Sequence, residues 1–94
     1  GKTGHVFQWD PEKAESNAAK HGVTFDDAVL VFLDPMAFTF RDPDHSVEED
    51  RDLTVGRVGP VLVLTVSHTD RDGDVRIIGA RRASPRERRR YEGR

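Results

Sequence analysis

The sequence of 94 residues contains no cysteine. This absence excludes disulfide bonds, metal sites built from thiolates and cysteine nucleophiles, and it favours the reducing cytoplasm. The sequence also lacks any apolar run near the roughly 20 residues that cross a bilayer, and no signal-peptide pattern is present. We therefore expect a cytoplasmic protein that makes no use of a membrane.

Motifs for metal binding and for serine chemistry are missing as well. No two histidines have the His-x-x-x-His spacing of a metal site, and residues 70–74 place their glycine wrongly for a calcium loop. No Gly-x-Ser-x-Gly motif is present that would expose a nucleophilic serine. We predict no metal and no cofactor, which leaves Arg, Lys, His, Glu and Tyr as the groups that could carry chemistry.

The charge is mild overall but strongly uneven along the chain. Residues 76–94 contain eight arginines and two glutamates, a net charge of +6. Residues 1–75 contain seven Lys and Arg against fifteen Asp and Glu, a net charge of −8. Guanidinium groups match phosphate oxygens two at a time, so the C-terminal segment suits phosphates or an acidic protein partner.

The length predicts a single domain with a small core. Residues 1–5 lack an initiator Met and are expected to be an expression remnant or a disordered N-terminus, so that the domain covers residues 6–94. Hydrophobic periodicity and capping residues predict the order β-α-α-β-β-β-β-α. Gly22 is expected to end the first helix, Ser84 and Glu87 to start the last helix as a capping box, and residues 70–74 to form a hairpin loop. The expected strands are 6–9, 36–40, 51–55, 61–66 and 75–81, and the expected helices are 11–20, 25–33 and 85–91.

Consecutive strands with short connections predict an α+β fold, in which helices cover one face of a mainly antiparallel sheet. Residues 61–66 are apolar without alternation, so we expect a central strand that is buried on both faces. In the preceding strand, alternation predicts that Leu53 and Val55 point inward while Asp52 and Thr54 point outward.

The remaining chemical groups suit the cleavage of RNA without a metal. The ribose 2′-OH of the substrate is then the nucleophile, and the protein has to move its proton, stabilise charge on phosphorus and protonate the leaving 5′ oxygen. We predict that Arg76, Arg81 and Arg82, on or just after the last strand, bear the phosphate charge. In a regular strand Arg76 and Arg82 share one face and Arg81 takes the other. The alternative is that each forms a surface salt bridge with the acidic segment 42–52.

Further candidates lie at the ends of other elements. Lys20 and His21 end the first helix, where His21 could act as acid or base with Lys20 in support, or could only cap the helix. His68 ends the central strand and could reach either the site or a solvent-exposed rim. Tyr91 could support the site, pack on the sheet or stack on a base. Three arginines of the last helix are expected either to bind RNA or to form a solvated face, namely Arg86, Arg89 and Arg90.

Both halves of the sequence carry a specific combination of motifs. The first half reads Phe7-x-Trp9-Asp10-x-x-Lys13, then Asn17, then Lys20-His21-Gly22-Val23-x-Phe25. The second half reads Asp44-His45-Ser46, Glu49-x-Arg51 and Arg76-Ile77-Ile78-x-Ala80-Arg81-Arg82-Ala83, followed by Glu87 and Tyr91. In combination, these motifs resemble the BrnT-type toxins from residue 6 to residue 91.

This resemblance implies a RelE-like fold and an endoribonuclease that arrests translation as the toxin of a type II toxin–antitoxin system. It implies RNA as the substrate and a BrnA-type ribbon-helix-helix antitoxin as the partner, with DNA contacted only through that antitoxin. The sequence departs from the family at Gly79, where Ser is usual, and at Asp52, where an aromatic residue is common. Two alternatives stay open: a non-catalytic basic module that binds nucleic acid or an acidic protein, and a structural domain whose arginines pair internally.

Overall fold

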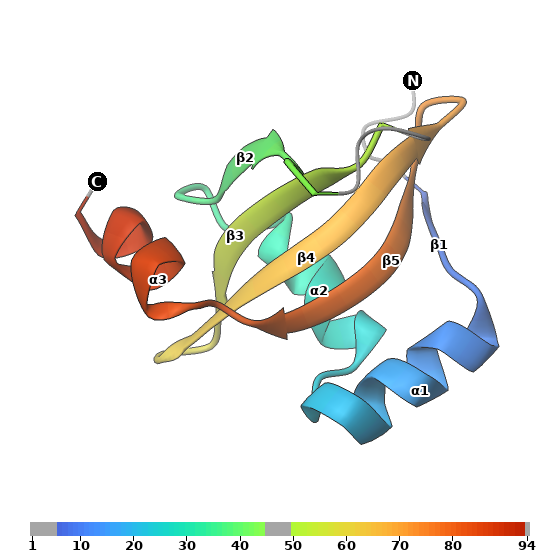
Figure 1. Ribbon diagram of the computed structural model, residues 1–94, viewed down its shortest axis with the longest axis horizontal. Coiled ribbons are helices and arrows are strands. Elements are labelled where there is room, and N and C mark those ends of the chain that lie inside the picture. The colour runs from blue at the N-terminus through green and yellow to red at the C-terminus, as the bar shows by residue number, and fades with distance from the viewer. Residues whose placement is uncertain (1–5, 45–49, 94) are drawn as a thin grey trace.

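The computed structural model describes residues 6–44 and 50–93 (Figure 1). Its elements are β1 (Phe7–Gln8), α1 (Pro11–His21), α2 (Phe25–Val31), β2 (Phe38–Arg41), β3 (Asp52–Val58), β4 (Leu62–Arg71), β5 (Asp74–Arg82) and α3 (Pro85–Glu92). This is the predicted order of strands and helices. The expected N-terminal remnant, residues 1–5, lies outside the described residues.

The described strands form one sheet in the order β1-β5-β4-β3-β2. Neighbouring strands are antiparallel except β1 and β5, which pair in parallel with Phe7 opposite Val75. The middle strand, β4, is the one predicted to be central, and residues 63–66 are buried although they alternate between its two faces. The predicted mainly antiparallel sheet with a fully buried centre is therefore confirmed.

The hairpin between β4 and β5 is tighter than predicted. We expected a loop over residues 70–74, whereas Arg71 already pairs with Asp74. Only Asp72 and Gly73 turn the chain, with φ angles of 53° and 86°. Two residues with positive φ give a turn whose twist matches that of the flanking strands, so both strands continue to its edge.

Each face of the sheet carries its own apolar cluster, because successive residues of β4 point to opposite sides. α1 and α2 cover the face of Leu64 and Val66, here called the α2 face (Figure 1). α3 packs on the opposite face, here called the α3 face, where Tyr91 contacts the cluster of Val55 and Val63. The prediction that all helices cover one face is thus wrong for α3. The physical reason is that the second face of the sheet is also apolar, so a helix has to shield it from water.

Coverage of both faces also corrects the prediction for Thr54. We expected an outward side chain, but Thr54 lies on the α2 face and is only 3% exposed. Its hydroxyl is 2.7 Å from the Thr39 hydroxyl and 2.7 Å from His68 Nε2. Thr54 therefore belongs to a polar row on the α2 face that is buried at Thr54 and His68 and exposed at Thr39, while Val55 is buried on the other face as predicted.

A β-bulge in β5 changes which arginines share a face. Ser67 lies opposite Gly79 and His68 opposite Ile77, so Ile78 has no partner on β4 and the alternation shifts by one residue. Arg76 lies opposite Thr69 and Arg81 opposite Thr65, which places both arginines on the α3 face. Arg82 lies opposite Leu64 on the α2 face. The expected pairing of Arg76 with Arg82 assumed a regular strand and is wrong for this reason.

Candidate active site

A small hollow lies where the end of α1 meets β4 and β5. It has a volume of about 130 Å³ and is called the His21–Arg81 hollow below. Two of the predicted catalytic residues, His21 from α1 and Arg81 from β5, line it together. The remaining lining residues are Asn17, Leu53, Thr65, Ser67, Gly79 and Ala80.

Helix α1 places Lys20 and His21 beside this hollow because the sequence fixes both of its ends. The Asp10 side chain accepts a hydrogen bond of 2.9 Å from the Glu12 amide at the N-terminus. At the C-terminus Gly22 takes the left-handed conformation, with φ 69°, and closes the helix on Ala18. Lys20 and His21 thus occupy the last turn, where cationic groups are favourable near the free carbonyls.

Asn17 attaches α1 to the edge of the sheet. Its Oδ1 accepts from the Ala80 amide at 3.1 Å, and its Nδ2 donates to the Ala80 carbonyl at 2.8 Å and to the Val23 carbonyl at 3.0 Å. β1 pairs only with Val75 and Arg76, so this side chain replaces a strand neighbour further along β5. No role for Asn17 followed from the sequence, where its only signal was its place in the motif that resembles the family.

Arg81 is held by Glu87 from the start of α3. Its Nη1 and Nη2 donate to the two carboxylate oxygens of Glu87 at 2.8 and 3.1 Å. These hydrogen bonds raise the pKa of Arg81, which stays charged. The predicted alternative for Arg81 named the acidic segment 42–52, but its direct partner is the capping glutamate six residues later.

Glu87 accepts hydrogen bonds from β4, from β5 and from the N-cap of α3. Its Oε1 also accepts from the Thr65 hydroxyl at 2.9 Å and from the Ser84 amide at 2.8 Å, while Ser84 caps α3 in return. Burial alone would raise the pKa of Glu87, but the hydrogen bonds from Arg81, Ser84 and Thr65 lower it to about 2. A carboxylate with such a low pKa is a poor proton acceptor, so Glu87 is suited to holding Arg81 and not to moving protons.

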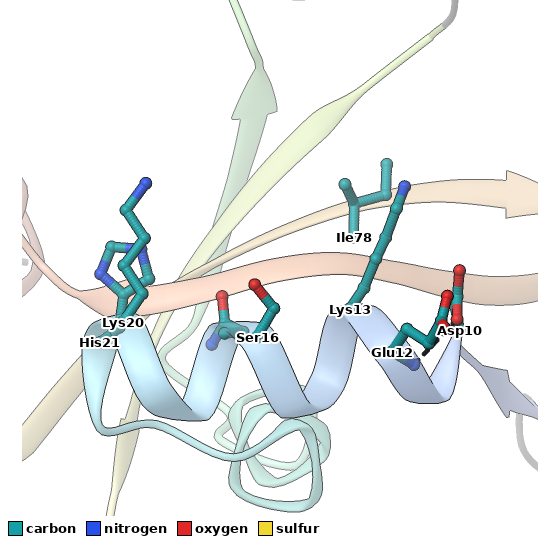
Figure 2. A pocket seen from close by; sticks show the side chains of 8 residues that line it. Asp10, Glu12, Lys13, Ser16, Lys20, His21 and Ile78 are labelled. Carbon is teal, nitrogen blue, oxygen red and sulfur yellow. Dashed lines mark hydrogen bonds between the residues drawn. The ribbon is translucent and has the colours of Figure 1, made fainter.

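A second, more open hollow of about 430 Å³ runs along α1 and shares Asn17 and His21 with the first. Figure 2 shows Lys13, Ser16 and Lys20 rising from α1 on the side of Ile78 in β5. Lys20 and His21 stand together at the end of this row (Figure 2). The two hollows therefore bring an imidazole, a guanidinium and two ammonium groups to one edge of the sheet, together with the carboxylates of Asp10 and Glu12.

The other two strand arginines do not reach the His21–Arg81 hollow. Arg76 is half-buried on the same face as Arg81, but their partners Thr69 and Thr65 are four residues apart on β4, which is roughly 13 Å at the rise of a strand. Arg82 is exposed and points to the α2 face. The three arginines thus do not form one pocket, and Arg81 alone combines a rigid strand with a hollow.

His68 and Tyr91 are also placed away from the hollow. His68 is 6% exposed on the α2 face, where Phe32 meets its ring edge-on at 5.0 Å. Burial lowers the pKa of His68, although Asp52 and Asp70 act in the opposite direction. Tyr91 is buried against the α3 face and donates a hydrogen bond of 2.5 Å to Asp34. Of the three predictions for Tyr91, packing on the sheet is the one that the structure shows.

The arginines of α3 are exposed, and two of them line a third hollow on the α3 face. Arg86 and Arg90 contact this hollow of about 420 Å³ between α3 and β2, while Arg89 does not. Within residues 6–44 and 50–93, no group of three His, Asp or Glu side chains is arranged to hold a metal ion. None of the described helices is long and apolar enough to span a bilayer.

Comparison with known proteins agrees with this architecture. The family described as "Ribonuclease toxin, BrnT, of type II toxin-antitoxin system" matches residues 9–87. The 1.1 Å crystal structure of the Brucella abortus ribonuclease toxin, BrnT, is 26% identical and superposes with a TM-score of 0.69 over 86% of this chain and 99% of that one. No curated protein matches significantly. The predicted α+β fold is confirmed and is compatible with the RelE-like superfamily. The chain therefore belongs to the BrnT family of ribonuclease toxins of type II toxin–antitoxin systems.

Proposed function

We propose that this chain is an endoribonuclease that cuts RNA without a metal, and that the His21–Arg81 hollow is its catalytic centre. The observation that carries the proposal is the meeting of His21 and Arg81 in one hollow, although they lie far apart in the sequence. Membership in a ribonuclease toxin family supports the reaction type. The hollow supports the choice of residues, because it offers proton transfer and positive charge at one place.

The ribose 2′ oxygen attacks the adjacent phosphorus, the bond from phosphorus to the 5′ oxygen breaks, and a 2′,3′-cyclic phosphate and a 5′-hydroxyl result. His21 takes the proton of the 2′-OH, since histidine exchanges protons readily near neutral pH. Arg81 stabilises the extra negative charge on the phosphorane through the donors that neither Glu87 nor the Arg82 carbonyl uses. Lys20, next to His21 in the last turn of α1, adds positive charge and can return a proton to the leaving 5′ oxygen.

Purified protein incubated with RNA in excess EDTA tests this proposal. Cleavage should persist, its products should carry 2′,3′-cyclic phosphate, and a substrate with deoxyribose at the cleavage position should stay intact. Arg81→Lys keeps a charge beside Glu87 but removes the fork, and His21→Ala removes the imidazole; each should lower the rate by about 10²–10³. Arg71→Ala, in the distant hairpin between β4 and β5, is the matched control. Full activity in both site variants would overturn the assignment.

Membership in a type II system implies an antitoxin partner. We propose that this antitoxin is of the BrnA type, that it carries a ribbon-helix-helix segment, and that the toxin meets DNA only through it in the cytoplasm. Co-expression of the chain with the product of the adjacent reading frame should relieve growth arrest and give a stable complex. If the toxin alone binds operator DNA as tightly as the complex does, this proposal fails.

A further inference from the structure

A groove between α3 and β2 adjoins the proposed catalytic hollow on the same face of the sheet. Its volume of about 420 Å³ lies within the roughly 300–1,000 Å³ of small-ligand pockets. Its lining consists of Phe38, Phe40, Pro43, Ser84, Arg86, Glu87 and Arg90. We call it the α3–β2 groove, and nothing in the cleavage chemistry above requires it.

Aromatic rings and one guanidinium form a layered surface in this groove. The rings of Phe38 and Phe40 lie 6.0 Å apart at an interplanar angle of 24°. The Arg90 guanidinium lies over both, 4.5 Å from the centre of Phe38 and 5.5 Å from the centre of Phe40. Phe38 is buried and Phe40 is half-buried, whereas Arg90 is exposed and is the member of this layer that solvent reaches. Flat aromatic rings and guanidinium planes are the surfaces on which unstacked RNA bases lie.

Two arginines of the groove also carry positive charges that are not paired with any carboxylate of the described residues. Arg81 and Arg88 are paired with Glu87 and Glu92, respectively. Among the described residues, Arg86 and Arg90 have no carboxylate partner within salt-bridge distance. Free guanidinium donors beside an aromatic surface fit a nucleotide, which combines a flat base with an anionic phosphate.

The groove shares a wall with the His21–Arg81 hollow. Glu87 lines the groove and holds Arg81, which lines the hollow. Phe40 of the groove lies directly opposite Leu53 of the hollow in the β2–β3 pair. Directly opposite residues are only about 5 Å apart, so the two cavities adjoin at Phe40 and Leu53, and Glu87 joins them again at Arg81. An RNA strand with its scissile phosphate at Arg81 would therefore lie next to the groove.

We propose that the α3–β2 groove is a subsite for the nucleotide that flanks the scissile phosphate, with its base stacked on the Arg90 guanidinium, which Phe38 and Phe40 support from below, and its phosphate at Arg86. The inference rests on the proposed ribonuclease function and adds a stacking contact to it. Every base has a flat face that can stack in this way. The groove is therefore expected to bind single-stranded RNA with little preference among bases. The alternative occupant, an acidic peptide segment, needs the guanidinium groups but not the aromatic rings.

The test measures binding of a single-stranded RNA oligonucleotide whose riboses are 2′-O-methylated, since this probe lacks the nucleophile and stays uncut. Arg90→Gln and Phe40→Leu should each raise its Kd about tenfold, as expected from the loss of one stacked base. Arg89→Gln removes the same charge from the same helix outside the groove and should change Kd about twofold. Thermal unfolding verifies that each variant is folded.

Equal weakening by Arg90→Gln and Arg89→Gln would overturn the subsite, because only general charge would then act. An unchanged Kd in Phe40→Leu, together with displacement of the probe by an acidic peptide, would overturn it in favour of peptide docking. Failure of the ribonuclease proposal would look different. The parent protein would leave ordinary RNA uncut, but Arg90→Gln would still weaken binding of the methylated probe more than Arg89→Gln does.

Discussion

The Arg81 guanidinium and the Glu87 carboxylate meet through two parallel hydrogen bonds of 2.8 and 3.1 Å on the α3 face. This pair joins the last strand to the first turn of α3 and fixes the direction in which Arg81 enters the hollow. A carboxylate that also accepts from Thr65 and Ser84 cannot rotate away without losing those bonds. We infer that Glu87 is a positioning residue whose value to the reaction lies in the orientation of Arg81.

Glu87→Gln should therefore lower kcat/KM for RNA by about 10- to 100-fold, because a small misplacement of a charge donor is costly to the transition state. The amide keeps the shape of the side chain but cannot accept bonds from all four donors. Glu92→Gln is the control, since Glu92 pairs with Arg88 on the same helix in an exposed position. Equal rates for the two variants in a cleavage assay, at equal thermal stability, would refute a positioning role.

The sequence predicted local features correctly where a residue type has one common structural role. Ser84 and Glu87 predicted the start of α3, and the structure shows the complete capping box. Gly22 predicted the end of α1, and it takes the left-handed conformation there. The unbroken apolar run of the central strand predicted its burial on both faces. Each of these predictions depends on neighbours within a few residues.

The site could not be read in the same way because it depends on contacts between distant segments. The bulge at Ile78 moves Arg76 and Arg81 to one face, and periodicity alone gave the opposite result. His68 looked accessible at the end of a strand, yet α2 covers it. The sequence named His21 and the three strand arginines as candidates, whereas only the sheet register separated Arg81 from Arg82.

Buried His68 should make folding stability depend on pH in the mildly acidic range. Burial holds the pKa of His68 below its usual 6.5, and its Nδ1 has no hydrogen-bond partner in the part of the chain that the structure describes. A proton is thus bound more readily by the unfolded chain, so stability falls as the pH drops below about 6.5. Urea unfolding between pH 7 and 5 should show this loss, and His68→Gln should reduce it. A variant with the same slope as the parent would contradict the prediction.

The three hydrogen bonds of Asn17 should be important for the attachment of α1 to β5. Asn17→Ala leaves the amide and carbonyl of Ala80 without these partners, which should cost about 2 kcal/mol of unfolding free energy. The Ala80 amide should also exchange its hydrogen faster, as hydrogen-exchange NMR can measure. Ser16→Ala, at the neighbouring position on exposed α1, serves as the control and should change neither quantity by much. If the Ala80 amide exchanged its hydrogen no faster in Asn17→Ala, water would be replacing the hydrogen bonds of Asn17 without loss of protection, and the prediction would be wrong.

Two strand glycines offer a final contrast, because neither is in the positive φ region and only one lacks space. A Cβ at Gly56 would lie 2.8 Å from Val31 Cγ1 and 3.0 Å from its carbonyl oxygen, under the fully buried side of α2. Gly56→Ala should therefore cost about 1–3 kcal/mol through overpacking. At Gly79 the nearest heavy atom is Asn17 Oδ1 at 3.7 Å, so Gly79→Ala should leave stability equal or slightly higher. Denaturant midpoints compare the two directly. If Gly56→Ala unfolds at the same midpoint as Gly79→Ala, α2 is not packed on β3 as closely as these distances require.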